Sequence, residues 1–305
     1  MTFFPSTPAR SIWLVSALAI GYLLLAALLL GFKPEQAGLV VFCLFMYFFA
    51  GGTRRFLLAF GAFVVFWILF DFMKALPNYQ VNPVHVRDLY EADKRLFHVG
   101  TESFNEFWLS RHTVFLDTLA GCAYLCWMPV PLAFGIYLFF RRRSFVVPFA
   151  LTFLWVNLLG FVIYYTFPAA PPWYVQLYGF DLHLHTPGNT AGLHRFDDYY
   201  HVHIFQGLYA KSSNVFAAMP SLHAAYPTVT LYYGFRSRAG WINLFLALVM
   251  GGIWFAAVYS SHHYVLDVLA GIACALAGII LFEKGLLKTG WFRRFLGAYQ
   301  GLVGA

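Results

Sequence analysis

The sequence predicts an all-α polytopic membrane protein with about eight transmembrane helices, cytoplasmic termini and an active site at the extracytoplasmic face. Of its 305 residues, 61% are hydrophobic and only 11% are charged, and the mean hydropathy is +0.67. Soluble domains carry about 25% charged residues. The other two observations are the long apolar runs along the chain and the uneven placement of basic residues between them.

Eight apolar runs approach or exceed the roughly 20 helical residues that cross a bilayer. The first, from Ser11 to Phe32, is longer than the apolar region of a signal peptide and is expected to be a retained transmembrane helix. The second and sixth runs are short for a span. No internal repeat is evident, which disfavours an inverted-repeat transporter. The predicted spans are 12–32, 36–51, 56–72, 113–140, 145–167, 219–235, 241–259 and 261–283.

Basic residues set the orientation. With the N-terminus inside, 12 of the 20 basic residues and one of the 13 acidic residues, Glu283, fall on the cytoplasmic side. Because this bias satisfies the positive-inside rule, the net charge of +7 reflects orientation and indicates no nucleic-acid partner. All 11 histidines fall at the opposite face.

The short chain favours a bacterial inner-membrane protein with a periplasmic site, or a luminal site in a eukaryote. The oligomeric state stays open.

Three regions follow from this topology. Residues 1–112 hold the N-terminal spans and a first extracytoplasmic loop, 113–283 form a catalytic helix bundle, and 284–305 form an amphipathic cytoplasmic tail. The loops 73–112 and 168–218 are unusually long, and such loops commonly carry function. The first loop has balanced charge and scattered apolar residues. It predicts one or two amphipathic helices at the interface that cover an acceptor site.

The stretch "YSSHHYVLDVLAG" (259–271) places ionisable groups at the start of the last span. His263 and Asp267 are four residues apart and share one helix face, whereas His262 points elsewhere. An aspartate that accepts from one imidazole nitrogen leaves the other free as a nucleophile or base. Aspartate within a membrane span indicates function, although capping or pairing near the interface is the alternative.

Two further segments lie on the same predicted face. In "NVFAAMPSLHAAYP" (214–227), Pro220 suits a helix start, Ser221 is a candidate cap and His223 falls in the first turn. The start of this helix suits a phosphate, beside which His223 is placed as a proton donor. "YYTFPAAPPWYVQLYG" (164–179) ends the fifth span, because its prolines stop the helix. Each motif alone also has a purely structural explanation.

Together, "PSLH" and "HHYVLD" resemble the second and third signature motifs of the type 2 phosphatidic acid phosphatase superfamily. The resemblance covers roughly 145–283. It implies that His263, with Asp267, forms a phosphohistidine, and that His223 acts as the acid and base.

Two departures point to one branch of that superfamily. Ala256 and Ala257 stand where the superfamily has Ser-Arg, and "FPAAPPWY" replaces its Lys…Arg-Pro motif. With "AGLHRFD", "FAAMPSLHAAYP" and "HHYVLDV", the chain resembles the inositol phosphorylceramide synthase branch, whose "HY-x-x-DV" element sphingomyelin synthases share. This resemblance implies a phosphotransferase of sphingolipid metabolism. An enzyme of this class is expected to move a phosphoinositol-type head group from a phospholipid donor to a lipid-alcohol acceptor and to need no cofactor.

Because the arginine of the Ser-Arg pair is missing, the motifs do not decide which cationic side chain binds the phosphate. Arg195, which matches the branch's "GL-x-R-x-D" element, is the first candidate and Lys211 the second; a solvated loop charge is the alternative for Arg195. The other predicted substrate or phosphate contacts are Ser221, Pro171, Trp173 and Tyr174.

Three other functions are alternatives to a phosphotransferase. A lipid phosphate or polyprenyl pyrophosphate phosphatase has the same residues with water as the acceptor. A transporter places ionisable groups near the midplane rather than at one face. A histidine-ligated haem protein is a further alternative. The loop histidines suit a transition metal or an extended polar edge; since the resemblance requires no metal, we expect none. They are His183, His185, His201 and His203.

Overall fold

The computed structural model describes residues 9–210 and 214–305, so the phosphate candidate Lys211 lies outside the described residues. Within these ranges the regular secondary structure is helical apart from two isolated bridges and one hairpin, in which β1 (His98–Val99) pairs antiparallel with β2 (Glu102–Ser103). The α-helices are α1 (Ala9–Leu30), α2 (Pro34–Phe49), α3 (Gly51–Ala59), α4 (Gly61–Phe72), α5 (Arg87–Leu96), α6 (Phe104–Ser110), α7 (Val114–Leu125), α8 (Pro129–Arg141), α9 (Val146–Thr166), α10 (Pro172–Tyr178), α11 (His194–Tyr200), α12 (Ile204–Tyr209), α13 (Leu222–Arg236), α14 (Ile242–Tyr259), α15 (Val265–Ile280) and α16 (Gly290–Val303). Short turns of other helix types are η1 (Met73–Ala75), η2 (Asn78–Gln80), η3 (Arg143–Phe145), η4 (Ala191–Leu193), η5 (Leu281–Gly285) and η6 (Leu286–Lys288).

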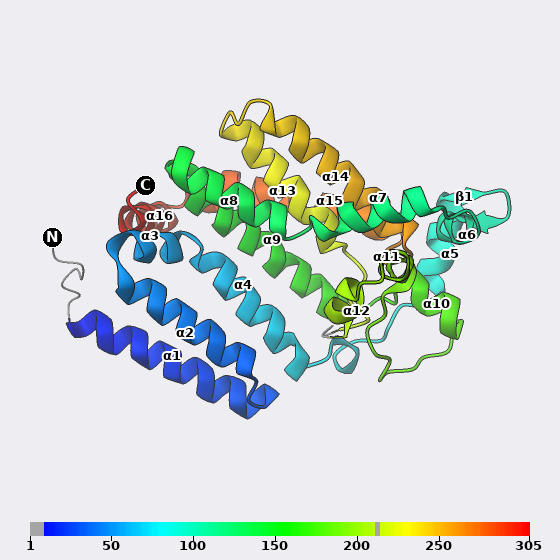
Figure 1. Ribbon diagram of the computed structural model, residues 1–305, viewed down its shortest axis with the longest axis horizontal. Helices are drawn as coiled ribbons and strands as arrows, with labels where there is room; N and C mark the ends of the chain where they lie inside the picture. Colours follow the sequence, from blue (N-terminus) through cyan, green and yellow to red (C-terminus); the bar gives the residue numbers. More distant parts are fainter. Residues whose placement is uncertain (1–8, 211–213) are drawn as a thin grey trace.

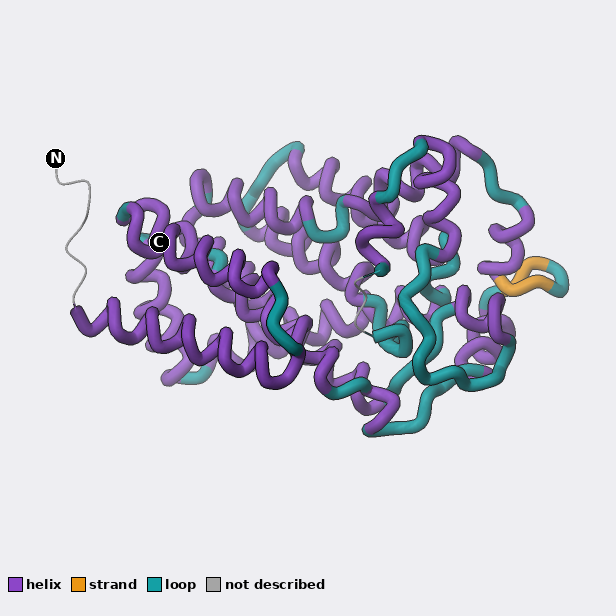
Figure 2. The backbone as a smooth tube through the Cα atoms, turned by 60° about the horizontal axis from the view of Figure 1, so that its bottom comes forward, coloured by secondary structure: helices purple, strands orange, loops and turns teal. Residues whose placement is uncertain are grey.

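Several short helices gather at one end of the molecule. Figure 1 places α5, α6, α10, α11 and α12 together at the right, whereas α16 and the start of α1 lie at the opposite end. Figure 2 shows long loop segments at the same end as the hairpin. We call this the loop-rich end. It is built from 73–112 and the described part of 168–218, the two long loops predicted from the sequence.

The predicted all-α membrane architecture is confirmed by helix length and composition. Among the described residues, four helices are long and apolar enough to cross a membrane, or six if each of two bent helix pairs counts as one span. Every predicted span overlaps one helix or a pair of consecutive helices. However, α2 has 16 residues and α13 has 15, which is short for a crossing. The number of eight spans therefore stays a prediction.

Two of the predicted spans are bent. The helices α7 and α8 meet at 44°, and the pair formed by α3 and α4 at 53°. The predicted span 113–140 divides because Pro129 and Pro131 lack N–H donors and their rings clash with carbonyls one turn earlier. A new helix, α8, therefore begins at Pro129.

The helix α9 lies at the centre of the bundle. Its Phe153 ring packs against Phe63 of α4 at 4.8 Å and against Tyr226 of α13 at 4.6 Å between ring centroids. The Tyr226 hydroxyl donates to Oδ1 of Asn157 at 2.7 Å, so a buried polar pair also joins α9 to α13. The helix α1 lies at the periphery, and only 6% of its apolar stretch is buried inside the protein, as expected of a helix surrounded by lipid.

The starts of α13 and α15 touch backbone to backbone. The Ser221 N–H donates to the carbonyl of Asp267 at 2.8 Å. One turn further along α15, a Cβ on Gly271 would lie 2.1 Å from the Ser221 carbonyl oxygen. Only glycine permits this approach. This backbone contact holds the motifs "PSLH" and "HHYVLD" against each other.

The remaining predicted elements are also present. The first long loop contains two helices, α5 and α6, joined by the hairpin. The tail forms α16, which docks at the end opposite the loops: the Tyr299 hydroxyl donates to the Leu58 carbonyl at 2.6 Å, and the Gln300 amide donates to the Ser144 carbonyl at 3.0 Å.

We expect Gly271→Ala to lower the melting temperature of the detergent-purified protein, because the added methyl group meets backbone and not a movable side chain. Overpacking of this kind costs about 1–3 kcal/mol. Gly251→Ala is the matched control, since a Cβ there has no atom within 4 Å. Its melting temperature should equal or slightly exceed that of the wild type. Equal melting temperatures for the two variants would contradict the close approach of α13 and α15.

Candidate active site

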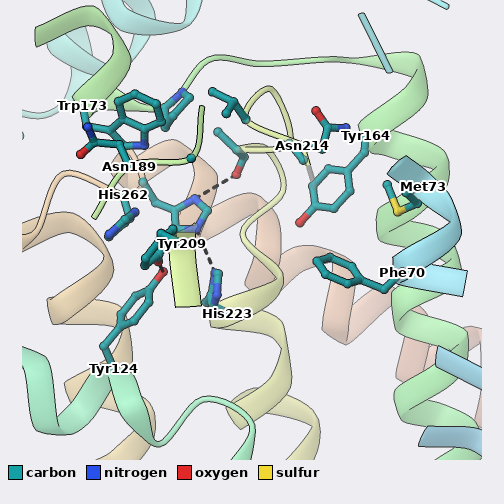
Figure 3. Close-up of a pocket in the computed structure, with 16 residues that line it drawn as sticks. Phe70, Met73, Tyr124, Tyr164, Trp173, Asn189, Tyr209, Asn214, His223 and His262 are labelled. Atoms are coloured by element: carbon teal, nitrogen blue, oxygen red, sulfur yellow. Dashed lines mark hydrogen bonds between the residues drawn. The ribbon is translucent and has the colours of Figure 1, made fainter. Parts of the chain in front are cut away.

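Segments far apart in the sequence line one cavity of about 140 Å³ at the loop-rich end. Figure 3 shows a histidine side, with His223 and His262, and an apolar side, with Phe70 and Met73 from the end of α4 and η1. His263 also lines the cavity. The structure therefore brings together the two histidines that were predicted to be catalytic.

The ring of His263 is held in one tautomer. Its Nδ1 lies 3.0 Å from the carbonyl oxygen of Ala218. A carbonyl only accepts, so Nδ1 carries the hydrogen and Nε2 of the neutral ring presents its lone pair. That Nε2 lies 3.2 Å from Nδ1 of His223. The unprotonated nitrogen of the predicted nucleophile thus faces the predicted acid and base.

Short extended segments fix the Ala218 carbonyl. The Ala218 N–H donates to the Ala169 carbonyl at 3.2 Å, and the Ala169 N–H donates to the Phe216 carbonyl at 2.9 Å. From the first loop, the His85 N–H donates to the Pro168 carbonyl at 2.8 Å. Both long loops therefore help to fix the carbonyl that orients His263.

The predicted shared helix face is wrong, because His263 precedes Tyr264, the N-cap residue of α15, whereas Asp267 lies in the first turn of that helix. Asp267 still lies beside His263, but the contact is longer than a hydrogen bond. Its Oδ2 lies 3.6 Å from Nδ1 of His263 and accepts the Tyr264 N–H at 2.8 Å. The side chain is fully buried. Asp267 therefore caps α15 and places negative charge beside the ring, whereas the Ala218 carbonyl selects the tautomer.

The predicted start of α13 is confirmed. Oγ of Ser221 accepts the Ala224 N–H at 3.3 Å. His223 lies in the first turn between the rings of Tyr124 and Trp127, each 4.9 Å away between centroids. The positive end of the helix dipole therefore lies beside the cavity, which suits an anion.

Three residues of the proline-rich segment were predicted to contact the substrate, and two of them lie in the cavity lining. Pro171 and Trp173 line the cavity, and the Trp173 N–H donates to the Ser261 carbonyl at 3.0 Å. Tyr174 is fully buried outside the cavity lining, and its hydroxyl donates to the Asp181 carbonyl at 2.8 Å. In this structure Tyr174 supports the second loop and does not face the cavity.

Arg195 of α11 also lies away from the cavity lining. Its Nε donates to Oδ1 of Asp117 in α7 at 2.6 Å, and the Tyr259 hydroxyl donates to the same oxygen at 2.8 Å. The Arg195 side chain is 12% exposed and that of Asp117 8%. This contact joins α7, α11 and the end of α14. A role for Arg195 as the phosphate ligand stays a prediction.

Most of the lining residues were missed by the sequence reasoning, among them His262, Tyr209, Asn189 and Asn214. Nε2 of His262 lies 2.9 Å from the Thr190 carbonyl, and the His262 ring stacks on Tyr209 at 4.5 Å. Asn189 and Asn214 line the cavity from the same loop. No local pattern marks a single asparagine or tyrosine in a long loop, and helix periodicity does not apply to His262, because it precedes α15.

One of the acidic residues of the second loop, Asp197, makes only local hydrogen bonds. The Asp197 carboxylate accepts the backbone N–H groups of Phe205 at 3.3 Å and Gln206 at 2.9 Å, and so caps α12. Among residues 9–210 and 214–305, no group of three His, Cys, Asp or Glu side chains is arranged to hold a metal ion.

These features define a class of protein. Two buried imidazoles face each other at the starts of two apolar helices, next to a carboxylate, and one of them presents an unprotonated nitrogen. This arrangement suits phosphoryl transfer through histidine at a membrane edge. The chain belongs to the PAP2 superfamily, which matches residues 87–281. The resemblance noted from the motifs is confirmed.

Several relatives have names. The chain is 45% identical over 288 residues to the phosphoinositol dihydroceramide synthase of Bacteroides thetaiotaomicron, covering 92% of this chain and 94% of that protein. It is 28% identical over 225 residues to the inositol phosphorylceramide synthase catalytic subunit of Schizosaccharomyces pombe, covering 72% of this chain and 52% of that protein. The Saccharomyces cerevisiae counterpart is 34% identical over 122 residues, or 38% of this chain and 29% of that protein. No solved structure gives a significant match.

We expect Arg195→Ala to destabilise the protein, because it leaves the carboxylate of Asp117 buried without its cation. Breaking one side of a buried ion pair costs roughly 3–5 kcal/mol. Arg111→Ala is the control: its pair with Glu102 is exposed, and such pairs contribute about 0–1 kcal/mol. Thermal melting measures both variants. A stable Arg195→Ala protein that has lost phosphate-ester binding would instead identify Arg195 as a phosphate ligand.

Proposed function

We propose that this protein transfers phosphoinositol from a phospholipid to the hydroxyl group of a ceramide-type lipid. The observation that carries the proposal is the contact of 3.2 Å between Nε2 of His263 and Nδ1 of His223 in the cavity. The substrate class is supported by the Bacteroides relative, which is named a phosphoinositol dihydroceramide synthase and is aligned over nearly its whole length.

In the first half-reaction, Nε2 of His263 forms a bond to phosphorus as the bond from phosphorus to the diacylglycerol oxygen breaks. Protonated His223 gives its proton to that oxygen. The phosphodiester replaces the direct contact between the two rings, and its charge favours the protonated form of His223. Asp267, 3.6 Å from Nδ1 of His263, stabilises the positive charge that the phosphorylated ring acquires.

In the second half-reaction, the acceptor hydroxyl gives its proton to His223 as its oxygen attacks phosphorus. The bond between phosphorus and Nε2 then breaks, which restores neutral His263. Each displacement is easier than one direct exchange between two poor nucleophiles. The capped start of α13, with Ser221, contributes positive potential to the phosphoryl oxygens.

The cavity suits a lipid head group because its two sides differ. Asn189, Asn214 and His262 offer hydrogen-bonding groups to a hydroxyl-rich ring, whereas Phe70 and Met73 present an apolar surface. The amide nitrogen of Asn214 is buried and has no protein partner among the described residues. A buried donor of this kind gains most from a ligand hydroxyl. We assign the polar side to the head group and the apolar side to the lipid backbone.

The orientation in the membrane follows from the basic residues. We place the loop-rich end, with the active site, outside the cytoplasm, and both termini with α16 inside it. In a bacterium this corresponds to a periplasmic site on the inner membrane. Residues 1–112, 113–283 and 284–305 then act as an N-terminal helical region with its covering loop, a catalytic bundle and a cytoplasmic tail.

Purified protein incubated with phosphatidylinositol and ceramide should form inositol phosphorylceramide and diacylglycerol, measured by mass spectrometry. His263→Ala should lower turnover by about 10⁴-fold or more, since removal of a covalent nucleophile leaves only binding and electrostatic effects. Phosphatidic acid and phosphatidylcholine serve as comparison donors. Release of free phosphate without a transfer product would favour a phosphatase, and full turnover by His263→Ala would reject the assigned nucleophile.

A phosphohistidine intermediate predicts retention of configuration at phosphorus, because two in-line displacements each invert it. A phosphorothioate analogue of phosphatidylinositol, with one defined configuration, is a suitable donor. Stereochemical analysis of the product measures the outcome. Inversion would show a single direct displacement by the acceptor and would leave His263 a different role.

A further inference from the structure

The first turn of α15, which follows the nucleophile, is capped from a distant part of the chain. The side chain of Tyr264 at the N-cap position makes no capping hydrogen bond. Asp267 takes the Tyr264 N–H, and Oδ1 of Asp93 takes the Leu266 N–H at 2.9 Å. Asp93 comes from α5 in the first long loop and is completely buried. A helix start that lacks a local cap depends on such a partner for its unpaired N–H groups.

Asn105 of α6 holds the other side of the same turn. Its Nδ2 donates to the carbonyl of Val258 at 2.8 Å and to the carbonyl of His263 at 3.1 Å. The first belongs to the last turn of α14 and the second to the nucleophile itself. The side chain of Asn105 is 1% exposed. One amide therefore ties the end of α14 to the backbone of the catalytic histidine.

The helices α5 and α6 form a braced unit. Glu106 accepts from the Tyr90 hydroxyl at 2.7 Å and from Nζ of Lys94 at 3.0 Å, which joins α6 to α5. Ser103 caps α6 in a reciprocal capping box with Glu106. Because each helix has its own cap or cross-link, Asp93 and Asn105 are held at a fixed separation against α15.

We propose that α5 and α6 clamp the nucleophile, with Asp93 and Asn105 as positioning residues of the transfer reaction. This proposal rests on the proposed function. The Ala218 carbonyl orients the ring of His263, whereas the clamp fixes the backbone that carries the ring. Histidine must meet phosphorus in line, and a displacement of about 1 Å costs roughly 100-fold in rate. The first loop thus does more than cover the site.

The charge of Asp93 fits this role. Burial raises the pKa of Asp93 to about 6, so the carboxylate remains ionised at pH 7.5. An anion at the start of α15 is stabilised by the helix dipole. An amide in its place retains an acceptor oxygen for the Leu266 N–H but gives up the charge, whereas an aliphatic side chain gives up both.

The test compares Asp93→Leu, Asp93→Asn and Asn105→Leu at pH 7.5, with Glu91→Ala as the matched control on the exposed face of α5. Only the monodisperse, folded fraction is assayed for transfer. Both leucine variants should lose about 100-fold in kcat while KM for each lipid stays unchanged. Asp93→Asn should recover most of the loss, and Glu91→Ala should match the wild type. If leucine prevents folding, Asp93→Ala and Asn105→Ala carry the same comparison.

Orthovanadate provides a readout that needs no lipid, because this oxyanion takes the five-coordinate geometry of phosphoryl transfer on a nucleophile. It should raise the melting temperature of the wild type and of Asp93→Asn. The leucine variants should need about tenfold more vanadate for the same shift. If the wild type responds to vanadate but makes no transfer product, the proposed function is wrong. In that case the vanadate titration alone tests whether α5 and α6 position His263.

Two results would overturn the clamp. One is wild-type kcat and wild-type vanadate response in the folded leucine variants. The other is an Asp93→Asn protein that performs no better than Asp93→Leu, since the shared acceptor oxygen would then have no effect.

Discussion

The site depends on the hydrogen bond between Nδ1 of His263 and the Ala218 carbonyl. This bond places the hydrogen on Nδ1, so the lone pair of Nε2 faces His223. A buried carbonyl needs a donor in any case, since leaving one unpaired costs about 1–3 kcal/mol. Stability and catalysis therefore require the same geometry. The carbonyl is fixed by backbone bonds to residues 168–169 and, through them, to residue 85. The orientation of one imidazole thus depends on three segments that are far apart in the chain.

The close contact between α13 and α15 explains how two short motifs become one site. The motif "PSLH" contains His223, and "HHYVLD" contains His263. The backbone contact between Ser221 and Asp267 brings the two motifs together. A glycine at 271 allows this contact without a gap. Buried polar side chains then specify the arrangement of the loops, because each of them must find a partner in a mostly apolar molecule. The paired Arg195 and Asp117, and the two carbonyls bound by Asn105, are examples.

The absence of the Ser-Arg pair has a structural counterpart. Ala256 and Ala257 are completely buried, and the carbonyl of Ala257 accepts the N–H groups of both His262 and His263. These positions therefore support the turn that carries His262 and His263. Within the described part of the chain, the residues that line the cavity include neither arginine nor lysine. The imidazoles, the start of α13 and the amide groups among these residues are available to interact with a phosphodiester.

The sequence by itself determined the helical membrane class, because apolar runs have no other stable form in lipid. It also predicted His223, His263 and Asp267 as the catalytic residues, since their spacing and context are local properties of short motifs. Helix periodicity predicted that Asp267 would orient His263 from the same helix face, but His263 precedes α15, and the Ala218 carbonyl takes the hydrogen bond from its Nδ1. Likewise, no local pattern marks Asn189, Asn214, Asp93 or Asn105. Their roles arise from contacts with residues many positions away, for instance 173 between Asp93 and Leu266 and 158 between Asn105 and His263. Only the tertiary structure decides such contacts, because the geometry of a buried hydrogen bond depends on how the whole bundle packs.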